Sequence, residues 1–334
     1  MRRRILAFAL GSLVLTTFQL VEAQQPAKIA RIGYLNPGHA SSRRYRIKAF
    51  RQGLKELGYV EGKNIIIEYR FADARPERLP ELARELVELN VDIIFAGGHP
   101  ATVAAKNATQ TIPIVTSSQD PVSSRFVAGL RRPAGNITGL TNLTSELVGK
   151  RLELLKDVIP QLSRVAVLWT PCWECPPGNT SSNPSTIWRR TEVAAQSLGV
   201  QLQAAEIRER DDLEPALAAM KQHRPEALLM LRNPLVNDLT KRIANLAVKT
   251  RLPAIYDEKR FPELGGLMSY GTDLADVDRR AAIYIDKILN GAKPADLPIA
   301  RPMKFELAIN LKTARVLGLK IPAHLLMEAD RVIE

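Results

Sequence analysis

The residues best suited to chemistry in this sequence are its two cysteines and its histidines. Cys172 and Cys175 form a C-x2-C pair, a spacing found in zinc sites and in redox-active dithiols. A zinc site would need two more ligands, and all the histidines are far away in the sequence. These are His39, His99, His223 and His324. A thioredoxin-like motif needs a helix after its first cysteine, but Pro176 and Pro177 follow this pair. We therefore expect no metal site, and interpret the pair as a loop disulfide or as two unreactive thiols.

Catalytic signatures are missing from the sequence. It contains no G-x-S-x-G elbow, no H-E-x-x-H, no G-x-x-x-x-G-K-[ST] loop and no G-x-G-x-x-G. Gly97-Gly98 stands between a predicted strand and a predicted helix, where a phosphate loop would also stand. Two glycines have a simpler role there, because they let the backbone turn sharply and approach a ligand closely. We predict a binding protein rather than an enzyme, and no cofactor.

The first residues have the pattern of an export signal. Three arginines at positions 2–4 precede an apolar run over 5–15, and 21–23 offers small residues at the spacing of a cleavage site. The alternative is an uncleaved anchor, although the apolar run is shorter than the roughly 18 to 20 residues that span a bilayer. We predict a signal peptide over 1–23, cleaved near Ala23, and a periplasmic protein without a lipid anchor.

The composition and charge of the chain limit which kinds of partner it is expected to bind. The chain has 334 residues, 46% of them apolar, which suits two cores better than one. The formal net charge is +12, and removing residues 1–23 leaves +10. Lysines and arginines are scattered among acidic residues, with no basic block that contains aromatics, so we expect no nucleic-acid partner.

Strand and helix patterns alternate along the chain from about residue 29. In the first half we predict strands at 32–35, 64–69, 91–96, 112–116 and 136–140, and helices at 46–57, 80–89 and 101–108. In the second half we predict strands at 164–169, 200–207, 227–231 and 252–256, and helices at 147–158, 187–198, 213–222 and 235–250. The tail adds strands at 267–270 and 305–311, a helix at 275–289 and a short helix before Leu317. Such alternation predicts βαβ units and parallel sheets.

We therefore predict an α/β fold with two doubly wound parallel-sheet lobes joined by a three-strand hinge. The tail is too short for its own core and should complete the two lobes. The expected N-terminal lobe is 28–140 plus 272–303, and the expected C-terminal lobe is 141–271 plus 304–334. The chain would cross between them near Gly139, Gly271 and Met303.

Candidate ligand-binding residues follow from this topology, because ligands of open parallel sheets bind beyond the carboxyl ends of the strands. The candidates are Asn36, His39, Gly98, His99, Ala101, Ser117, Asp120, Thr170, Asn233, Asp257 and Tyr270. Pro100 fits the first position of a helix, so the amides of Ala101 and Thr102 should point at the cleft and suit a carboxylate. Asn233-Pro234 predicts a similar helix start in the other lobe.

Several candidates have alternative interpretations. Asp120 suits an ammonium or hydroxyl group, or an Asx turn before Pro121. His99 has an alternative capping or surface role, and Asp257 an alternative salt bridge to Lys or Arg. Trp169, Tyr256 and Tyr270 would stack on a flat ligand or belong to the core.

Several segments of the sequence resemble one family. They are GYVEGKNI at 58–65, EYR at 68–70, RLPELA at 78–83, TIPIV at 111–115, DPV at 120–122, GNITG at 135–139, GGLMSYG at 265–271, DKILNGAKPADLP at 286–298 and KFELAINLKTA at 304–314. They resemble the ABC transporter substrate-binding proteins described as tryptophan/tyrosine-type. The resemblance implies a type I periplasmic binding fold, a cleft that closes on a small-molecule ligand such as an aromatic or other amino acid, and partnership with an ABC permease and ATPase.

The sequence departs from the family at one point. An Asn-Pro usually follows the strand that ends here at Trp169, whereas this chain has Thr170-Pro171. This leaves the ligand open. We expect a monomeric, periplasmic substrate-binding component of an ABC import system. The alternative is an extracytoplasmic sensing module that feeds a membrane receptor. A cytoplasmic sugar-responsive repressor would need a helix-turn-helix where the export signal stands.

Overall fold

The computed structural model describes residues 29–118, 121–122, 124–170 and 186–334. The predicted signal peptide, Asp120 and the pair Cys172 and Cys175 lie outside these residues. Within the described part of the chain, none of the helices combines the length and the apolar character needed to cross a membrane.

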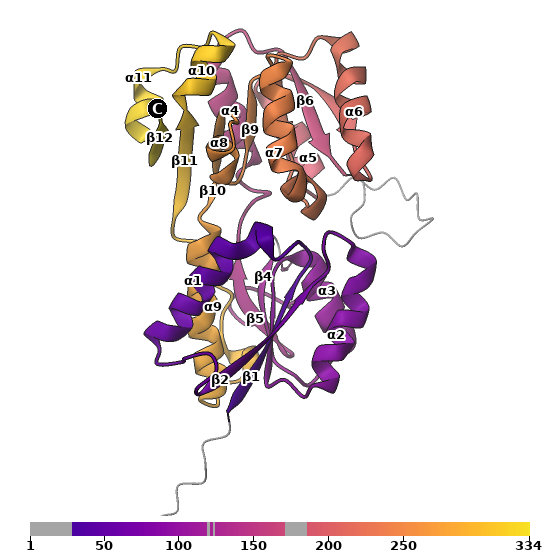
Figure 1. The fold of residues 1–334 in the computed structure, drawn as a ribbon, viewed down its shortest axis with the longest axis vertical. Helices are drawn as coiled ribbons and strands as arrows, with labels where there is room; N and C mark the ends of the chain where they lie inside the picture. Colours follow the sequence, from indigo (N-terminus) through magenta and orange to yellow (C-terminus); the bar gives the residue numbers. More distant parts are fainter. Residues whose placement is uncertain (1–28, 119–120, 123, 171–185) are drawn as a thin grey trace, which may run out of the picture.

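The first lobe is built on a parallel sheet with the strand order β2-β1-β3-β4-β5. Its strands are β1 (Ala30–Asn36), β2 (Ile65–Phe71), β3 (Ile93–Ala96), β4 (Ile114–Ser118) and β5 (Ile137–Thr141). Its helices are α1 (Arg44–Glu56), α2 (Leu79–Glu88), α3 (His99–Ala108) and α9 (Leu274–Leu289), with the short turns η1 (Ser41–Arg43) and η2 (Pro76–Arg78). The pair α1 and α9 packs on one face of the sheet, and α2 and α3 pack on the other (Figure 1).

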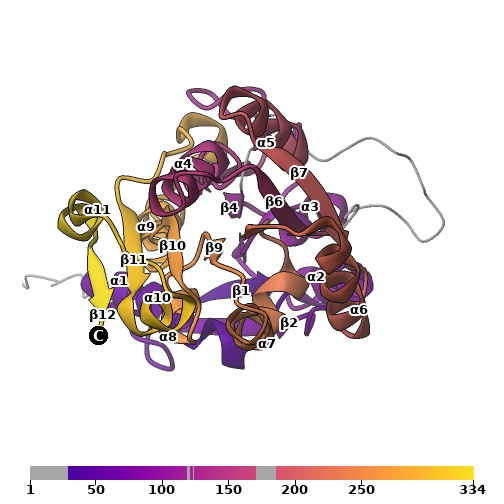
Figure 2. The same ribbon diagram turned by 90° about the horizontal axis from the view of Figure 1, so that it is seen from above.

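The second lobe is built on a sheet with the order β12-β11-β10-β9-β8-β6-β7. Its strands are β6 (Arg164–Trp169), β7 (Gln201–Glu206), β8 (Ala227–Met230), β9 (Ala254–Tyr256), β10 (Met268–Thr272), β11 (Phe305–Asn310) and β12 (Arg331–Ile333). The longer helices are α4 (Val148–Val158), α5 (Thr186–Ser197), α6 (Leu213–Met220) and α7 (Pro234–Lys249). Shorter ones are η3 (Arg210–Asp212), η4 (Lys221–His223), α8 (Arg260–Glu263), α10 (Leu311–Leu317) and α11 (Ala323–Glu328). Figure 2 shows α4 and α5 on one side of this sheet and α6 and α7 on the other.

The second sheet is mostly parallel, as predicted, and one pair of neighbouring strands departs from this. Strand β11 runs antiparallel to β10, and β12 pairs parallel to β11. The path of the chain explains this reversal. After β10 the chain enters the first lobe as α9, then passes through η5 (Pro294–Asp296) and comes back as β11. A strand that enters the sheet at the end where its neighbour leaves must run in the opposite direction.

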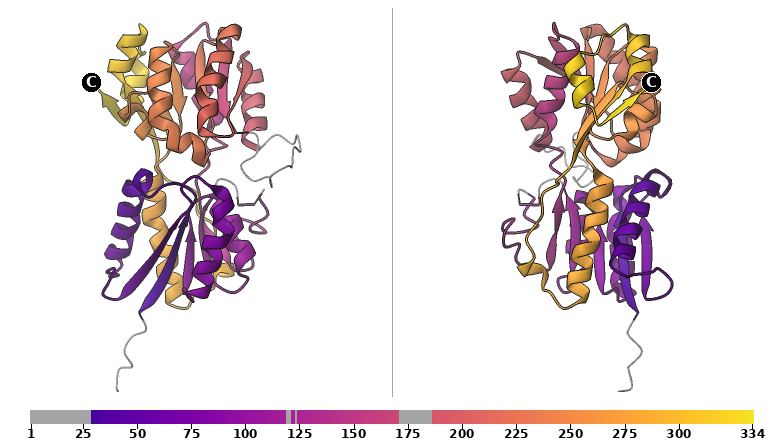
Figure 3. Two further views of the ribbon diagram at one scale, coloured as in Figure 1. Left: turned by 45° about the vertical axis from the view of Figure 1, so that its right-hand side comes forward. Right: turned by 90° about the vertical axis from the view of Figure 1, so that its left-hand side faces the viewer.

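The lobes lie one above the other and narrow to the segments that join them (Figure 3). The described chain crosses between the sheets after β5, after β10 and before β11. Two contacts tie the first two crossings together. The hydroxyl of Thr272 donates to the Asn142 carbonyl over 2.5 Å, and the guanidinium of Arg151 bonds the carbonyls of Thr144 and Tyr270. Hydrogen bonds therefore join the first two crossings.

Candidate functional site

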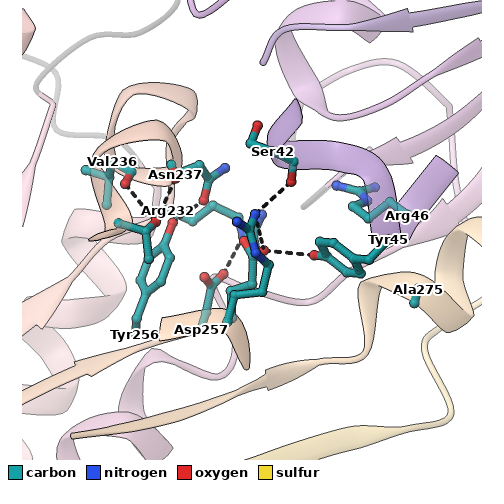
Figure 4. Close-up of polar contacts among 12 residues, drawn as sticks. Ser42, Tyr45, Arg46, Arg232, Val236, Asn237, Tyr256, Asp257 and Ala275 are labelled. Carbon is teal, nitrogen blue, oxygen red and sulfur yellow. Dashed lines mark hydrogen bonds and ion pairs between the residues drawn. The ribbon is translucent and has the colours of Figure 1, made fainter. Parts of the chain in front are cut away.

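The two lobes touch through side chains near the carboxyl ends of their strands. The hydroxyl of Tyr45, at the start of α1, donates to the Glu258 carboxylate over 2.8 Å. Arg260 of α8 donates to the backbone oxygen of Ser42 in η1 over 2.7 Å. Figure 4 shows Tyr45 and Ser42 from the first lobe facing Arg232 and Asp257 from the second. The strand ends of both lobes thus border one interlobe interface.

A set of buried polar atoms at this interface has no hydrogen-bond partner among the described residues. All lie at or just after the carboxyl end of a strand. Three belong to the last residue of a strand: Asn36 Nδ2 in β1, Ser118 Oγ in β4 and Trp169 Nε1 in β6. Two belong to the residue that follows a strand: Thr170 Oγ1 after β6 and Asp257 Oδ1 after β9. A buried polar atom without a partner costs about 1 to 3 kcal/mol, so proteins rarely keep several unless a ligand or water binds them. These atoms mark the candidate site.

Charged side chains surround Asp257. Its Oδ2 accepts a hydrogen bond from Arg232 Nε at 2.5 Å, and Arg232 also reaches Glu258 Oε2 at 3.3 Å. The alternative salt bridge predicted for Asp257 is therefore present, while Oδ1 of the same carboxylate has no partner. Burial works against ionisation of Glu258, yet the pKa of Glu258 is lowered because Arg232 and Arg43 attract its charge and Tyr45 donates to it.

A second buried ion pair lies beside the interface in the first lobe. Arg46 of α1 binds Asp278 of α9 through two 2.7 Å hydrogen bonds, and its Nη2 lies 3.4 Å from the hydroxyl of Ser117. Burial would lower the pKa of Arg46, but the carboxylate of Asp278 outweighs it and raises the pKa. The predicted site residue Ser117 is thus buried next to this pair.

His39 uses both ring nitrogens on protein groups. Nδ1 lies 3.0 Å from Asp73 Oδ1, and Nε2 lies 3.3 Å from Asp238 Oδ2 and 3.1 Å from Arg210 Nη2. Asp73 belongs to the first lobe, whereas Asp238 and Arg210 belong to the second. His39 lies at the predicted edge of the sheet, where it connects the lobes. A role in ligand binding stays a prediction.

The predicted anion site at α3 is partly wrong. The helix begins at His99, one residue before the proline, with Gly98 as its N-cap at φ 108°. The amide of Thr102 donates to the Gly98 carbonyl over 3.1 Å as the first helical hydrogen bond, so it does not point freely at the interface. The side chain of Ala101 packs in the core. Nδ1 of His99 lies 3.0 Å from Ser124 Oγ.

The remaining predicted residues lie in the second lobe. Asn233 is the N-cap of α7, as its pairing with proline predicted, and its side-chain oxygen accepts from the Val236 amide at 2.8 Å. Tyr270 is half-buried on β10 next to the hinge. The other two aromatic candidates, Trp169 and Tyr256, both pack against protein groups. Trp169 stacks on Trp188 with ring centroids 4.5 Å apart. Tyr256 is fully buried in the core, and its hydroxyl bonds Asn237.

Sequence reasoning missed several interface residues. Arg43, Tyr45, Arg232 and Glu258 were not predicted, although Arg232 and Glu258 are neighbours in sequence of the predicted Asn233 and Asp257. A charged residue directly after a buried strand was the available signal. No such signal marked Arg43 and Tyr45, because both lie at the start of a helix whose outer face is polar.

The chain was compared with known proteins. The family model described as ABC transporter substrate binding protein matches residues 37–333. A tyrosine-binding protein of Clostridioides difficile (strain R20291) is 26% identical over 275 residues, which are 82% of this chain and 76% of that protein.

Solved structures agree on the fold. A conserved domain protein of Vibrio cholerae O1 biovar eltor is 26% identical with a TM-score of 0.83, covering 91% of this chain and 100% of that one. The ABC domain in complex with L-Trp from Streptococcus pneumonia is 23% identical with a TM-score of 0.80, covering 91% of this chain and 99% of that one. The fold is that of the type I periplasmic binding proteins, and the chain belongs to the ABC transporter substrate binding protein family.

Proposed function

We propose that this protein captures one small molecule between its lobes and delivers it to an ABC permease and its ATPase for import. The observation that carries the proposal is the set of unpaired buried atoms that both lobes present at their strand ends. A ligand held there would contact both lobes only when they are closed. Binding would therefore favour the closed form, which a permease can select.

An amino acid is the ligand class we favour. The buried charged residues of the described chain are three arginines (Arg43, Arg46 and Arg151) and three acids (Asp257, Glu258 and Asp278). The side chains of Arg232 and Asp238, only 8% and 2% exposed, add one charge of each sign. Because a closed interface tolerates little net charge, this balance suits a ligand whose own charges cancel. A zwitterionic amino acid meets this condition, and the relatives bear the names of tyrosine and tryptophan.

Within the site, Asp257 Oδ1 is suited to accept from an ammonium or hydroxyl group. Asn36 Nδ2 is a donor, and so is Trp169 Nε1, so both are suited to a carboxylate or carbonyl oxygen. The lobes we propose to close on the ligand are 28–140 plus 272–303 and 141–271 plus 304–334. We also propose export by the segment 1–23, a monomeric state in the periplasm, and no catalytic role.

The test is a ligand screen on the purified mature protein. L-Tyrosine, L-tryptophan, the other amino acids and a set of neutral and anionic metabolites would be added in turn while thermal unfolding is followed. A true ligand at 100 times its Kd adds about 2.7 kcal/mol to the free energy of unfolding and raises Tm. If no amino acid raises Tm, the ligand class is wrong.

A pair of variants places the ligand in the site. Asp257→Asn keeps the size of the side chain but removes its charge, and should weaken ligand binding by about tenfold or more. The control is Asp157→Asn on the outer surface of the second lobe, where Asp157 lies 3.8 Å from His324. Equal affinity of Asp257→Asn and the native protein would place the ligand elsewhere. Uptake of labelled ligand by cells with and without the gene then tests import.

A further inference from the structure

His39 lies between two carboxylates that belong to different lobes. The first is Asp73, 3.0 Å from Nδ1, and it comes from the loop after β2. The second is Asp238, 3.3 Å from Nε2, and it comes from the second turn of α7. Arg210 of η3 also approaches Nε2, at 3.1 Å. One imidazole ring thus connects the lobes at the edge of the candidate site.

The contacts determine which nitrogen carries a proton. Burial works against ionisation of Asp73, but hydrogen bonds from Arg78 and His39 lower its pKa, so Asp73 is ionised near neutral pH. An ionised carboxylate only accepts, so Nδ1 donates to Asp73. The state of Nε2 decides the cross-lobe contact. Without a proton, Nε2 accepts a hydrogen bond from Arg210. With a proton, the ring is attracted to the Asp238 carboxylate, whose Oδ2 lies 3.3 Å from Nε2 and has no hydrogen-bond partner among the described residues, and it repels Arg210.

The two second-lobe groups differ in their freedom to move. The side chain of Arg210 is 50% exposed and can turn into solvent, whereas that of Asp238 is 2% exposed. Asp238 is also held by Ser42, whose hydroxyl lies 3.3 Å from Oδ1. The remaining charges around the ring are Arg43, which faces Asp238, and Arg78, which binds Asp73 at 2.7 Å. A protonated ring therefore keeps its carboxylate partner while Arg210 can withdraw.

We propose that His39 is a proton-dependent latch: its protonated ring joins Asp73 of the first lobe to Asp238 of the second and holds the lobes closed. The latch rests on the proposed function in that the closed lobes retain the ligand. Opening separates both Asp238 and Arg210 from the ring but leaves Asp73 in place. A protonated ring then loses an ionic contact, whereas a neutral ring loses only the hydrogen bond from Arg210. Protonation of His39 thus favours the closed form.

The latch has a limited pH range. Histidine ordinarily changes its charge between about pH 5 and pH 8, so the latch should strengthen as the pH falls through this range. Burial raises the pKa of Asp238, with Arg43, His39 and Arg210 opposing the rise. In more acidic solution Asp238 itself becomes protonated, and the attraction between Asp238 and the ring is lost. The ligand should be held most tightly in mildly acidic solution.

The binding experiment measures the affinity for L-tyrosine by calorimetry at about pH 6 and about pH 8. One cross-lobe ion pair of this exposure should make the native affinity roughly fivefold tighter at the lower pH. His39→Gln, which cannot change its charge, should give the same affinity at both. The matched control is His324→Gln, because His324 Nε2 lies 3.8 Å from Asp157 within one lobe. This control should keep the native ratio.

A second measurement needs no ligand. Small-angle scattering of the ligand-free protein should give a smaller radius of gyration at the lower pH for the native chain and for His324→Gln, but not for His39→Gln or Asp238→Asn. Circular dichroism confirms that each variant is folded. A pH-dependent radius of gyration that persists in folded His39→Gln overturns the latch.

The two experiments separate the two proposals. If L-tyrosine binds but the pH ratio survives in His39→Gln, the latch is wrong and the proposed function stands. If no amino acid binds, the ligand proposal fails, and the scattering experiment alone decides on the latch.

Discussion

The hydroxyl of Tyr45 in the first lobe donates a 2.8 Å hydrogen bond to Glu258 in the second. Burial, and then the charge of Glu258, raise the pKa of Tyr45 well above its ordinary value, so the hydroxyl keeps its proton. Because the bond joins the two lobes, separating them would break it. It therefore stabilises the closed form without a contact to the strand-end atoms that mark the candidate site.

Tyr45→Phe should shift the lobes toward the open form. A hydrogen bond to a charged group is worth about 1.5 to 3 kcal/mol, so ligand affinity should fall by about tenfold or more while the fold remains intact. The control is Tyr284→Phe, since the Tyr284 hydroxyl bonds the Pro298 carbonyl within the first lobe. Calorimetry of both variants decides the matter, and an unchanged affinity in Tyr45→Phe would show that this bond does not assist closure.

Arg46 and Asp278 form a buried pair between α1 and α9. Arg46→Met leaves the carboxylate uncompensated and should lower the free energy of unfolding by about 3 to 5 kcal/mol. The double variant Arg46→Met with Asp278→Leu removes both charges and should recover most of this loss. Urea unfolding measures all three proteins. A double variant no more stable than Arg46→Met would contradict the explanation.

Gly271 on β10 has no room for a side chain. A Cβ atom built there would lie 2.0 Å from the backbone oxygen of Asp257, so Gly271→Ala must displace that residue. We expect a loss of about 1 to 3 kcal/mol in stability and weaker ligand binding, since Asp257 belongs to the candidate site. Gly129→Ala serves as the control because nothing lies within 4 Å of its Cβ position. If Gly271→Ala and Gly129→Ala unfold at the same temperature, the proposed clash with Asp257 is wrong.

Glu226 should raise the free energy of unfolding, except in acidic solution. Burial works against its ionisation, but the amides of Ser163 and Arg164 donate to it and lower the pKa of Glu226 below its ordinary value of 4.5. A lowered pKa means that the unfolded chain binds the proton more readily. The contribution is thus fully present above about pH 5 and is lost as the pH falls through the lowered pKa. The stability difference between the native protein and Glu226→Gln should shrink on acidification, and urea unfolding at several pH values measures it.

The helices, the strands and several of their ends were predictable because they depend on neighbours in sequence. The helices predicted to end at residues 57, 198 and 289 are each followed within two residues by a glycine. These glycines, Gly58, Gly199 and Gly291, have the positive φ angles that end helices. Asn233 caps α7 as its position before Pro234 indicates. The alternation of elements also predicted the α/β class. The carboxyl ends of the strands indicated Asn36, Thr170 and Asp257, each of which has a buried polar atom without a partner among the described residues.

The interlobe interface depends on distances that local pattern does not contain. Tyr45 and Glu258 are 213 residues apart, and Arg46 and Asp278 are 232 apart. Periodicity in the sequence reports which face of an element is buried, not which distant charge it meets there. Only the tertiary structure, which returns α9 to the first lobe and β11 to the second, decides these pairs. The direction of β11 follows from the same path, because a strand's direction is set by the end at which the chain enters the sheet.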